Sequence, residues 1–293
     1  HRPVRRLSAG GIAEVFVTPP ARDDGGTEMI AIKRIRPHLR GVAEACELFT
    51  HEATLLGALA HPGIVRALDV SAAAREGWFT LELVHGRGLV EVVRRAERVG
   101  VRMPLRHAIG IVAATAEALE HAHVQPGPDR KPLEVVHCDV SPANLMLAYD
   151  GSVKLVDFGA AQSRLRRANS RALPNAGTLA YMSPEQSRGE AVDRRSDVYA
   201  LGVLLWELAT WSRLYRRLGP EQIIARVAVG AVPLPSQLRA DIPSELEDVI
   251  MIAVQPTRER RFANAGELAR ALRRLSGAED RRGLDAWLRR VFH

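Results

Sequence analysis

The sequence has few cysteines and no long apolar run. Its two cysteines, Cys46 and Cys138, lie far apart among 293 residues, so they form neither a disulfide framework nor the paired spacing of a metal site. A segment that crosses a bilayer needs about 18 or more apolar residues, and the longest apolar stretch, residues 198–211, is interrupted by Glu207. These absences predict a cytoplasmic domain with reduced cysteines and no membrane segment within this chain.

Lysine and aromatic residues are also scarce. The chain carries 41 basic and 34 acidic residues, for a net charge of +7, yet only Lys33, Lys131 and Lys154 are lysines, and aromatic residues make up 5%. The arginines are scattered among the acids, whereas a nucleic-acid groove needs clustered basic groups and aromatic side chains for stacking. We therefore expect no nucleic-acid partner. The scarcity of lysine makes any lysine at a motif position informative.

The stretch from residue 137 to residue 159 reads HCDVSPANLMLAYDGSVKLVDFG. An Asp-Gly pair at 150–151 stands between two apolar runs, which predicts a β-hairpin. Folding of this hairpin would bring Asn144, at its entry, beside Asp157, at its exit, with Asp139 one loop away. Carboxylate and amide oxygens that converge on a point suit Mg²⁺, which completes its shell with water and phosphate oxygens. The pattern therefore favours phosphoryl transfer.

This stretch resembles the catalytic core of eukaryotic-type (Hanks-type) bacterial serine/threonine protein kinases. HCD stands where the family has H-R-D, Asn144 where it has the catalytic-loop asparagine, and DFG at 157–159 is its D-F-G. The string D-V-S-P-x-N is similar to that of one bacterial subgroup. The resemblance implies that Asp139 orients, or accepts the proton of, a protein hydroxyl, and that Asn144 and Asp157 bind Mg²⁺.

The first strand pair of the chain contains a glycine turn. Residues 7–16 read LSAGGIAEVF, which is similar to the kinase glycine-rich loop over the phosphates of ATP. Ser8 and Ala13 replace two of its three glycines. Both residues are small, so the loop backbone can still approach the phosphates closely, but a positive φ is costlier at these two positions than at glycine. The resemblance implies ATP contacts from a set of residues in this loop: Leu7, Ser8, Gly10, Gly11 and Val15.

Lys33 ends a β-branched run, residues 29–33, that resembles the family's V-A-I-K. A lysine at a buried strand end needs an anionic partner. The helix predicted over residues 42–60 carries Glu52 among its apolar positions, and the resemblance implies that Glu52 pairs with Lys33 so that the ammonium meets the α- and β-phosphates. A solvated surface glutamate is the alternative interpretation. We assign both residues to the catalytic group.

The strand predicted over residues 78–84 corresponds to the family's hinge. Leu81 stands at the gatekeeper position, and the Glu82 carbonyl and the Val84 N–H are expected to meet adenine. The predicted ATP-binding residues also include two apolar and two charged residues: Ala31, Met146, Lys33 and Asp157.

Residues 160–185 are the expected activation segment. The string GTLAYMSPEQ ends it and resembles serine/threonine kinases, which implies that Thr178 lies near Asp139 and assists catalysis. Ser163, Ser170 and Thr178 are candidate phosphorylation sites. The basic run at 164–171 is either a solvated loop or a site that docks substrate or pairs with phosphate, and the sequence leaves both interpretations open.

The remaining motifs have structural roles in the family. A helix that is apolar nearly all round follows Ser196, which we predict as its N-cap. The resemblance implies that Asp197 holds the main chain of the catalytic loop and that Arg261 pairs with Glu185. Other helices are expected over residues 104–124, 264–275 and 279–291.

The catalytic loop departs from the family at two positions. Cys138 replaces an arginine that commonly pairs with a phosphorylated activation loop, and Ser141 replaces a lysine near the transferring phosphoryl group. The first change suggests activity without activation-loop phosphorylation. The second removes one electrostatic donor, which can cost on the order of 10²-fold in rate. These changes support an alternative function, a pseudokinase or weakly active ATP-binding scaffold. A small-molecule phosphotransferase ranks last, because such enzymes lack the S-P-E string and the helix aspartate.

The expected fold is α+β, a two-lobed protein kinase fold. Residues 1–84 form an N-lobe with a small antiparallel sheet and one helix, and residues 85–293 form a larger, mainly helical C-lobe. We expect this catalytic domain to be part of a longer protein, to use ATP and Mg²⁺, and to phosphorylate serine or threonine in protein substrates, itself in trans among them.

Overall fold

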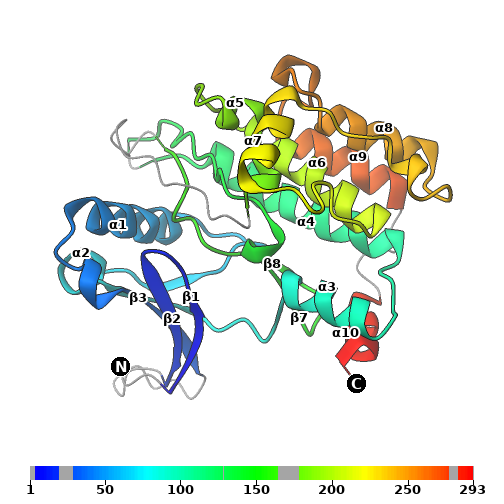
Figure 1. Cartoon of the computed structure of the whole chain (residues 1–293). Helices are drawn as coiled ribbons and strands as arrows, with labels where there is room; N and C mark the ends of the chain where they lie inside the picture. The colour runs from blue at the N-terminus through cyan, green and yellow to red at the C-terminus, as the bar shows by residue number, and fades with distance from the viewer. Residues whose placement is uncertain (1–3, 20–28, 128, 164–177, 277–282, 293) are drawn as a thin grey trace.

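The computed structural model describes residues 4–19, 29–127, 129–163, 178–276 and 283–292. Its sheet-rich and helix-rich parts form the two lobes that the sequence predicts, and the connection between them passes through the residues after β5 (Figure 1). The candidate phosphorylation site Ser170 and the whole basic run, residues 164–171, lie outside the described residues.

The N-lobe sheet is antiparallel, with strand order β1-β2-β3-β5-β4. Its strands are β1 (Arg5–Ala9), β2 (Ala13–Thr18), β3 (Ile30–Ile35), β4 (Ala67–Asp69) and β5 (Trp78–Glu82). Side chains alternate between the two faces of a strand. Val15 is opposite Lys33 on one face, whereas Phe16 is opposite Ile32 on the other. The expected strand 78–84 ends two residues early, because Glu82 is already opposite Ile30, the first residue of β3.

The turn between β1 and β2 is closed by a hydrogen bond from the Gly10 N–H to the Ala13 carbonyl at 2.8 Å. None of Ser8, Gly10, Gly11 and Ala13 has a positive φ. The cost of a positive φ at Ser8 and Ala13 therefore does not arise, and the two replacements carry no such conformational penalty.

One long helix, α1 (Ala43–Ala58), packs against the N-lobe sheet (Figure 1). Its buried residues recur at helical spacing and include Leu48, Phe49, Ala53 and Leu56, and Phe49 contacts Phe79 of β5 with ring centroids 5.0 Å apart. The short helix α2 (Ala73–Glu76) leads into β5. This packing fixes the position of Glu52, which lies on the same buried face.

The C-lobe is built around α6 (Arg195–Thr210), which is buried almost throughout, as its composition predicts. The surrounding helices are α3 (Leu89–Arg98), α4 (Leu105–Val124), α5 (Pro184–Ser187), α7 (Pro220–Val229), α8 (Ser244–Ala253), α9 (Ala265–Ser276) and α10 (Leu284–Phe292). Short 3-10 helices connect some of them: η3 (Pro142–Asn144), η4 (Leu179–Tyr181), η5 (Pro235–Gln237) and η6 (Arg258–Arg260), with η2 (Pro37–Leu39) before α1. Part of the predicted helix 279–291 lies outside the described residues.

The predicted N-cap of α6 is wrong. The helix begins at Arg195, and its N-cap residue, Arg194, makes no capping hydrogen bond from its side chain. Ser196 lies one residue inside the helix, and its hydroxyl donates instead to Oε1 of Glu185 at 2.6 Å. A serine that has a buried carboxylate within reach bonds to that carboxylate rather than to its own backbone.

A second sheet, β6-β7-β8, lies on the side of the C-lobe that is nearer to the N-lobe (Figure 1). Its strands are β6 (Gly86–Gly88), β7 (Leu145–Ala148) and β8 (Val153–Leu155). The predicted hairpin is confirmed: β7 and β8 are antiparallel, Gly151 adopts a φ of +85°, and Asp150 accepts a hydrogen bond from the Ser152 N–H at 2.8 Å.

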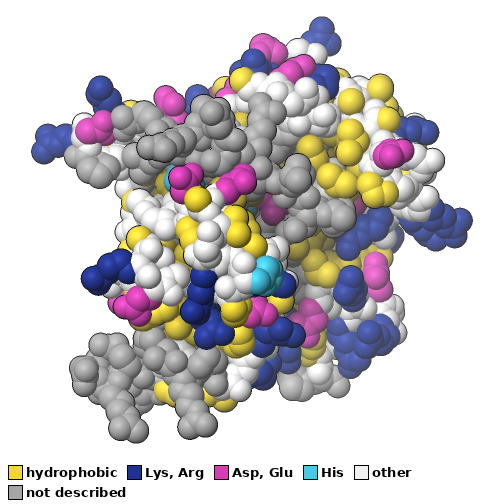
Figure 2. Space-filling model, turned by 60° about the vertical axis from the view of Figure 1, so that its left-hand side comes forward, with side chains coloured by type: hydrophobic (Ala, Val, Ile, Leu, Met, Phe, Trp, Pro, Cys, Tyr) yellow, Lys and Arg dark blue, Asp and Glu magenta, His cyan; other side chains and the backbone are white. Residues whose placement is uncertain are grey.

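The surface carries charges of both signs. On the face shown in Figure 2, Lys and Arg side chains lie in separate groups with Asp and Glu side chains beside them. Within the described part of the chain, no helix combines the length and the apolar character needed to cross a membrane.

Candidate active site

Lys33 joins an element of each lobe. It is buried on β3, its ammonium pairs with Oε1 of Glu52 on α1, and its Nζ lies 3.0 Å from Oδ1 of Asp157 in the C-lobe. The predicted ion pair between Lys33 and Glu52 is therefore present. The contact with Asp157 adds a second carboxylate, which sequence analysis did not assign to this lysine.

The three charges set one another's ionisation. Burial lowers the pKa of Lys33, but Asp157 and Glu52 outweigh burial and raise that pKa well above its ordinary value. The Lys33 ammonium in turn lowers the pKa of Asp157, whereas burial raises the pKa of Glu52. Lys33 therefore stays an ammonium and Asp157 a carboxylate, the charge states that can hold phosphate oxygens and a cation.

The hairpin brings Asn144 and Asp157 together, as predicted. The Val156 N–H donates to the Asn144 carbonyl at 2.9 Å, so Asp157 follows directly beside Asn144. Asp157 has a φ of +67° and accepts a hydrogen bond from the Gly159 N–H at 3.2 Å. A non-glycine residue in this region costs about 1–3 kcal/mol, and such residues cluster at functional sites.

Asp139 lies next to Asn144 at the start of the catalytic loop. The Asn144 side-chain amide donates to the Asp139 carbonyl at 2.8 Å and to its Oδ2 at 2.9 Å. Burial raises the pKa of Asp139, while His137 and hydrogen bonds from Asn144 and Thr178 act against that rise. The expected proximity of Thr178 to Asp139 is thus present. A raised carboxyl pKa makes Asp139 a stronger base than an exposed aspartate.

The donor set fits Mg²⁺. The Asn144 amide nitrogen is turned toward Asp139, which leaves its amide oxygen as the free end of the group. Lys33 and Gly159 occupy Oδ1 of Asp157, and its side chain is 47% exposed. One amide oxygen and one carboxylate oxygen are hard ligands of the kind that Mg²⁺ prefers, with water and phosphate completing its shell. Among the described residues, no cluster of three or more His, Cys, Asp or Glu offers a metal site.

Asp197 of α6 anchors the catalytic loop. Its carboxylate accepts hydrogen bonds from the N–H groups of His137 at 2.8 Å and Cys138 at 2.9 Å, and it bonds to Nε2 of His123 at 2.8 Å. The side chain of Gln186 donates to the Cys138 carbonyl at 2.9 Å. Cys138 therefore keeps a left-handed φ of +64° with both of its main-chain groups bonded.

Sequence patterns do not predict the contacts of His123 and Gln186, because each of these side chains finds its partner far away in the chain. The ring of His137, the first residue of the HCD motif, packs edge-on against Phe158, with centroids 4.7 Å apart.

The buried pair of Glu185 and Arg261 is confirmed. Two parallel hydrogen bonds of 2.7 and 2.8 Å join them, and the Arg261 guanidinium lies 4.9 Å from the Tyr199 ring centroid. This pair connects the end of the activation segment to the loop before α9.

The predicted nucleotide-contact residues lie on several strands. Leu7 and Ser8 lie on exposed β1, Gly10 and Gly11 form the turn, and Val15 of β2 is directly opposite Lys33. Buried Ala31 lies two residues before Lys33 on β3, and half-buried Met146 of β7 is opposite Gly88 in the second sheet.

The expected hinge residues lie at the end of β5 and directly after it: Glu82 is its last residue, and Val84 follows two residues later. The Glu82 side chain accepts hydrogen bonds from the Arg66 N–H at 2.8 Å and from Lys154 at 2.7 Å. Its carboxylate therefore joins strands of the two lobes, a structural role that sequence analysis did not predict. Val84 is half-buried against the core.

Comparisons with known proteins agree with this geometry. The family model described as protein kinase domain matches residues 3–270. The chain is similar to the tyrosine-protein kinase MasK of Myxococcus xanthus (37% identity, covering 92% of this chain and 42% of that protein) and to the serine/threonine-protein kinase PknB of Mycolicibacterium smegmatis (34% identity, 89% and 40%). The chain thus spans about two fifths of the length of these relatives.

A solved structure shows the same architecture. The crystal structure of a mutant of the Mycobacterium tuberculosis PknI kinase domain superposes with a TM-score of 0.66 at 26% identity, covering 94% of this chain and 95% of that one. The sequence match and the arrangement of Lys33, Glu52, Asp139, Asn144 and Asp157 lead to one conclusion. The chain belongs to the protein kinase domain family.

Proposed function

We propose that this chain is an ATP-dependent protein kinase that phosphorylates serine or threonine hydroxyls in proteins. One observation carries the proposal: Lys33 is bonded to Glu52 and Asp157 at once. The bond to Glu52 requires α1 to be packed close to β3, and the bond to Asp157 requires the 157–159 turn to face Lys33. Phosphoryl transfer by a protein kinase needs both arrangements. The site is therefore assembled as phosphoryl transfer requires.

Each residue of the site has a proposed role. Lys33, held by Glu52, binds the α- and β-phosphates of ATP, and Asn144 and Asp157 hold Mg²⁺, which neutralises charge on the phosphates. Asp139 accepts the hydrogen bond of the substrate hydroxyl and directs its oxygen, with Thr178 bonded to the same carboxylate. The nucleotide lies where the two proposed lobes meet, near residue 84. It is surrounded there by the glycine turn, Ala31, Met146, the Glu82 carbonyl and the Val84 N–H. A cytoplasmic location fits the use of ATP.

The identity of the acceptor hydroxyl needs its own test, because the relatives include proteins named for tyrosine as well as for serine and threonine. The contact between Thr178 and Asp139 supports serine or threonine. Phosphoamino-acid analysis of the chain after autophosphorylation should give phosphoserine and phosphothreonine, and phosphotyrosine alone would overturn the assignment. Phosphorylation of a Lys33→Met chain by the wild-type chain would establish transfer in trans.

Labelled γ-phosphate transfer from Mg·ATP to a generic basic protein tests the activity. The Lys33→Met and Asp157→Asn variants should lose transfer, since each removes a charge that holds phosphate or cation, and a chelator should abolish transfer by the wild type. Lys131→Met, a change at an exposed lysine, is the matched control. Nucleotide binding without any transfer would instead favour the scaffold function that Cys138 and Ser141 suggest.

A further inference from the structure

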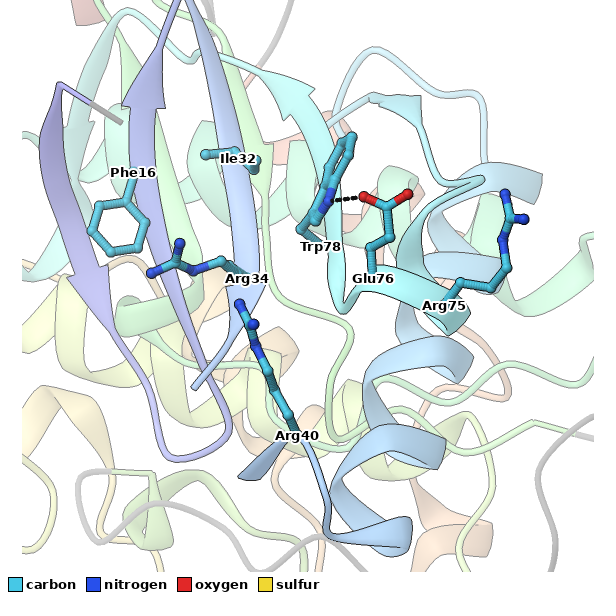
Figure 3. Close-up of a pocket in the computed structure, with 7 residues that line it drawn as sticks. All are labelled: Phe16, Ile32, Arg34, Arg40, Arg75, Glu76 and Trp78. Carbon is cyan, nitrogen blue, oxygen red and sulfur yellow. Dashed lines mark hydrogen bonds between the residues drawn. The ribbon is translucent and has the colours of Figure 1, made fainter. Parts of the chain in front are cut away.

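The outer face of the N-lobe sheet carries a concave pocket of about 560 Å³. Phe16, Ile32 and Trp78 supply its apolar surface, and Arg34, Arg40, Arg75 and Glu76 its charges (Figure 3). Because side chains alternate along each strand, this pocket opens on the face opposite to Val15 and Lys33. It is therefore separate from the site at which phosphoryl transfer is proposed.

The arginines of this pocket lack acidic partners within the described part of the chain. Two carboxylates in and beside the pocket are engaged: Glu14, opposite Arg34 in the sheet, pairs with Arg6 at 2.9 Å, and Glu76 accepts a hydrogen bond from the Trp78 indole at 2.8 Å. Nε of Arg34 is buried and has no hydrogen-bond partner. Since the Arg34 guanidinium lines the pocket without an acidic partner among the described residues, an anion bound there would stabilise it.

The side chains are arranged to take both an anion and an apolar group. Figure 3 shows Arg34 and Arg40 next to one another, with Phe16 on one side and Trp78 and Glu76 on the other, while Arg75 stands farther away on α2. The Arg34 guanidinium lies 5.4 Å from the Phe16 ring centroid, within the range of a cation–π contact. Two guanidinium groups in one pocket suit the oxygens of a phosphate group, which arginine binds through two parallel hydrogen bonds.

We propose that this pocket docks a phosphorylated segment of a partner protein, with the phosphate between Arg34 and Arg40 and a neighbouring apolar side chain against Phe16, Ile32 and Trp78. The choice of a phosphorylated peptide rests on the proposed function, because phosphoserine and phosphothreonine are the products of that reaction. Binding on this face leaves the transfer site open to another hydroxyl of the same protein.

A nucleic acid fits the pocket less well. Recognition of a nucleic-acid backbone uses a basic stripe that follows successive phosphates. The pocket instead is a single hollow in which two arginines converge, and on the face in Figure 2 basic groups are separated by acids. The size and the apolar wall favour one phosphorylated side chain and its neighbour.

Fluorescence anisotropy tests this proposal without any catalytic step. The probe is a labelled short peptide with one phosphothreonine beside one phenylalanine and no basic residue. Titrations contain Mg²⁺ and excess ADP, so that the proposed nucleotide site does not capture the phosphate. The Arg34→Gln/Arg40→Gln variant should weaken binding at least tenfold, since charge-assisted hydrogen bonds contribute about 1.5–3 kcal/mol. Arg40→Gln alone, at an exposed residue that does not threaten folding, should weaken it severalfold.

Two controls keep the result specific. Arg94→Gln, at an exposed arginine of α3, removes the same charge far from the pocket and should leave the affinity unchanged. The unphosphorylated peptide should bind at least tenfold more weakly than the phosphorylated one. Equal binding of the two peptides, equal affinity of all variants, or stronger binding of a short DNA duplex that Arg40→Gln also weakens would overturn the proposal. A chain that binds the peptide but transfers no phosphate would refute the proposed function and leave the docking site standing.

Discussion

Arg261 and Glu185 form a bidentate ion pair in the interior of the C-lobe, with Nη1–Oε1 at 2.7 Å and Nη2–Oε2 at 2.8 Å. Arg261 is 6% exposed and Glu185 is 2% exposed. Removal of one partner leaves the charge of the other buried without a counter-charge. Arg261→Met should therefore lower the free energy of unfolding by about 3–5 kcal/mol, measured by urea denaturation.

The control for this variant is Arg258→Met, which breaks partly exposed pairs with Glu259 and Asp193. Exposed ion pairs contribute about 0–1 kcal/mol. Equal losses in the two variants would show that the buried pair contributes nothing beyond an exposed one.

The same pair predicts a pH dependence of stability. Burial alone would raise the pKa of Glu185, but the hydrogen bonds from Arg261 and Ser196 lower it from 4.5 to about 2. A carboxyl whose pKa is lower in the folded state stabilises the fold at pH values above its unfolded pKa. The stabilisation, roughly 3 kcal/mol, should be lost as the pH falls from about 4.5 to about 2. Melting curves of Glu185→Gln should show a shallower fall across this window than those of the wild type.

Glu52→Gln should reduce phosphoryl transfer by about 10²-fold, the typical loss for one electrostatic group of an active site. The amide keeps the size of the side chain but removes its negative charge, so the ion pair that holds the Lys33 ammonium on the side of α1 is lost. Glu47→Gln, at an exposed position of α1, is the matched control. The proposed role of Glu52 fails if both variants transfer phosphate at the wild-type rate.

The raised pKa of Asp139 predicts the acid side of the activity profile. Only the carboxylate can accept the hydroxyl proton, so the rate of transfer should fall as the pH drops through the raised pKa, at a higher pH than an exposed aspartate would give. Asp139→Asn should lower the rate by roughly 10²–10⁴-fold and remove this inflection. An unchanged pH profile in the variant would assign the inflection to another group.

Gly86→Ala should destabilise the chain by about 1–3 kcal/mol, because a methyl group at this position would lie 2.1 Å from the Leu147 carbonyl oxygen and the backbone must move to admit it. Gly88→Ala is a matched control two residues away in β6, where no atom lies within 4 Å of the added carbon. Similar melting temperatures for the two variants would contradict this packing of β6 on β7.

The parts of the site that depend on short-range rules were predictable. The Asp-Gly pair specifies a hairpin through the positive φ of Gly151, and the hairpin then fixes how Asn144 meets Asp157. Lys33 was identifiable because a lysine at a buried strand end requires an anionic partner, and the resemblance to the kinase family implied that Glu52 is that partner.

The remaining parts depend on which group is nearest in space. Ser196 has a good N-cap side chain, yet Glu185 lies within reach and takes its hydrogen bond. His123 and Gln186 bond to residues 74 and 48 positions away. The outer pocket could not be predicted either, because nothing in the sequence distinguishes Arg34 and Arg40 from the many other arginines. Only the alternation of side chains along the sheet and the position of η2 place these two residues in one pocket.

The anchoring of the catalytic loop has a consequence for local motion. The N–H groups of His137 and Cys138 end on Asp197, inside a helix that is buried on every side. These amides can exchange only when their hydrogen bonds to this buried carboxylate break. We therefore expect their hydrogen exchange to be slower than that of exposed loop amides. The same two bonds hold the loop in place although one of its residues, Cys138, keeps a left-handed backbone.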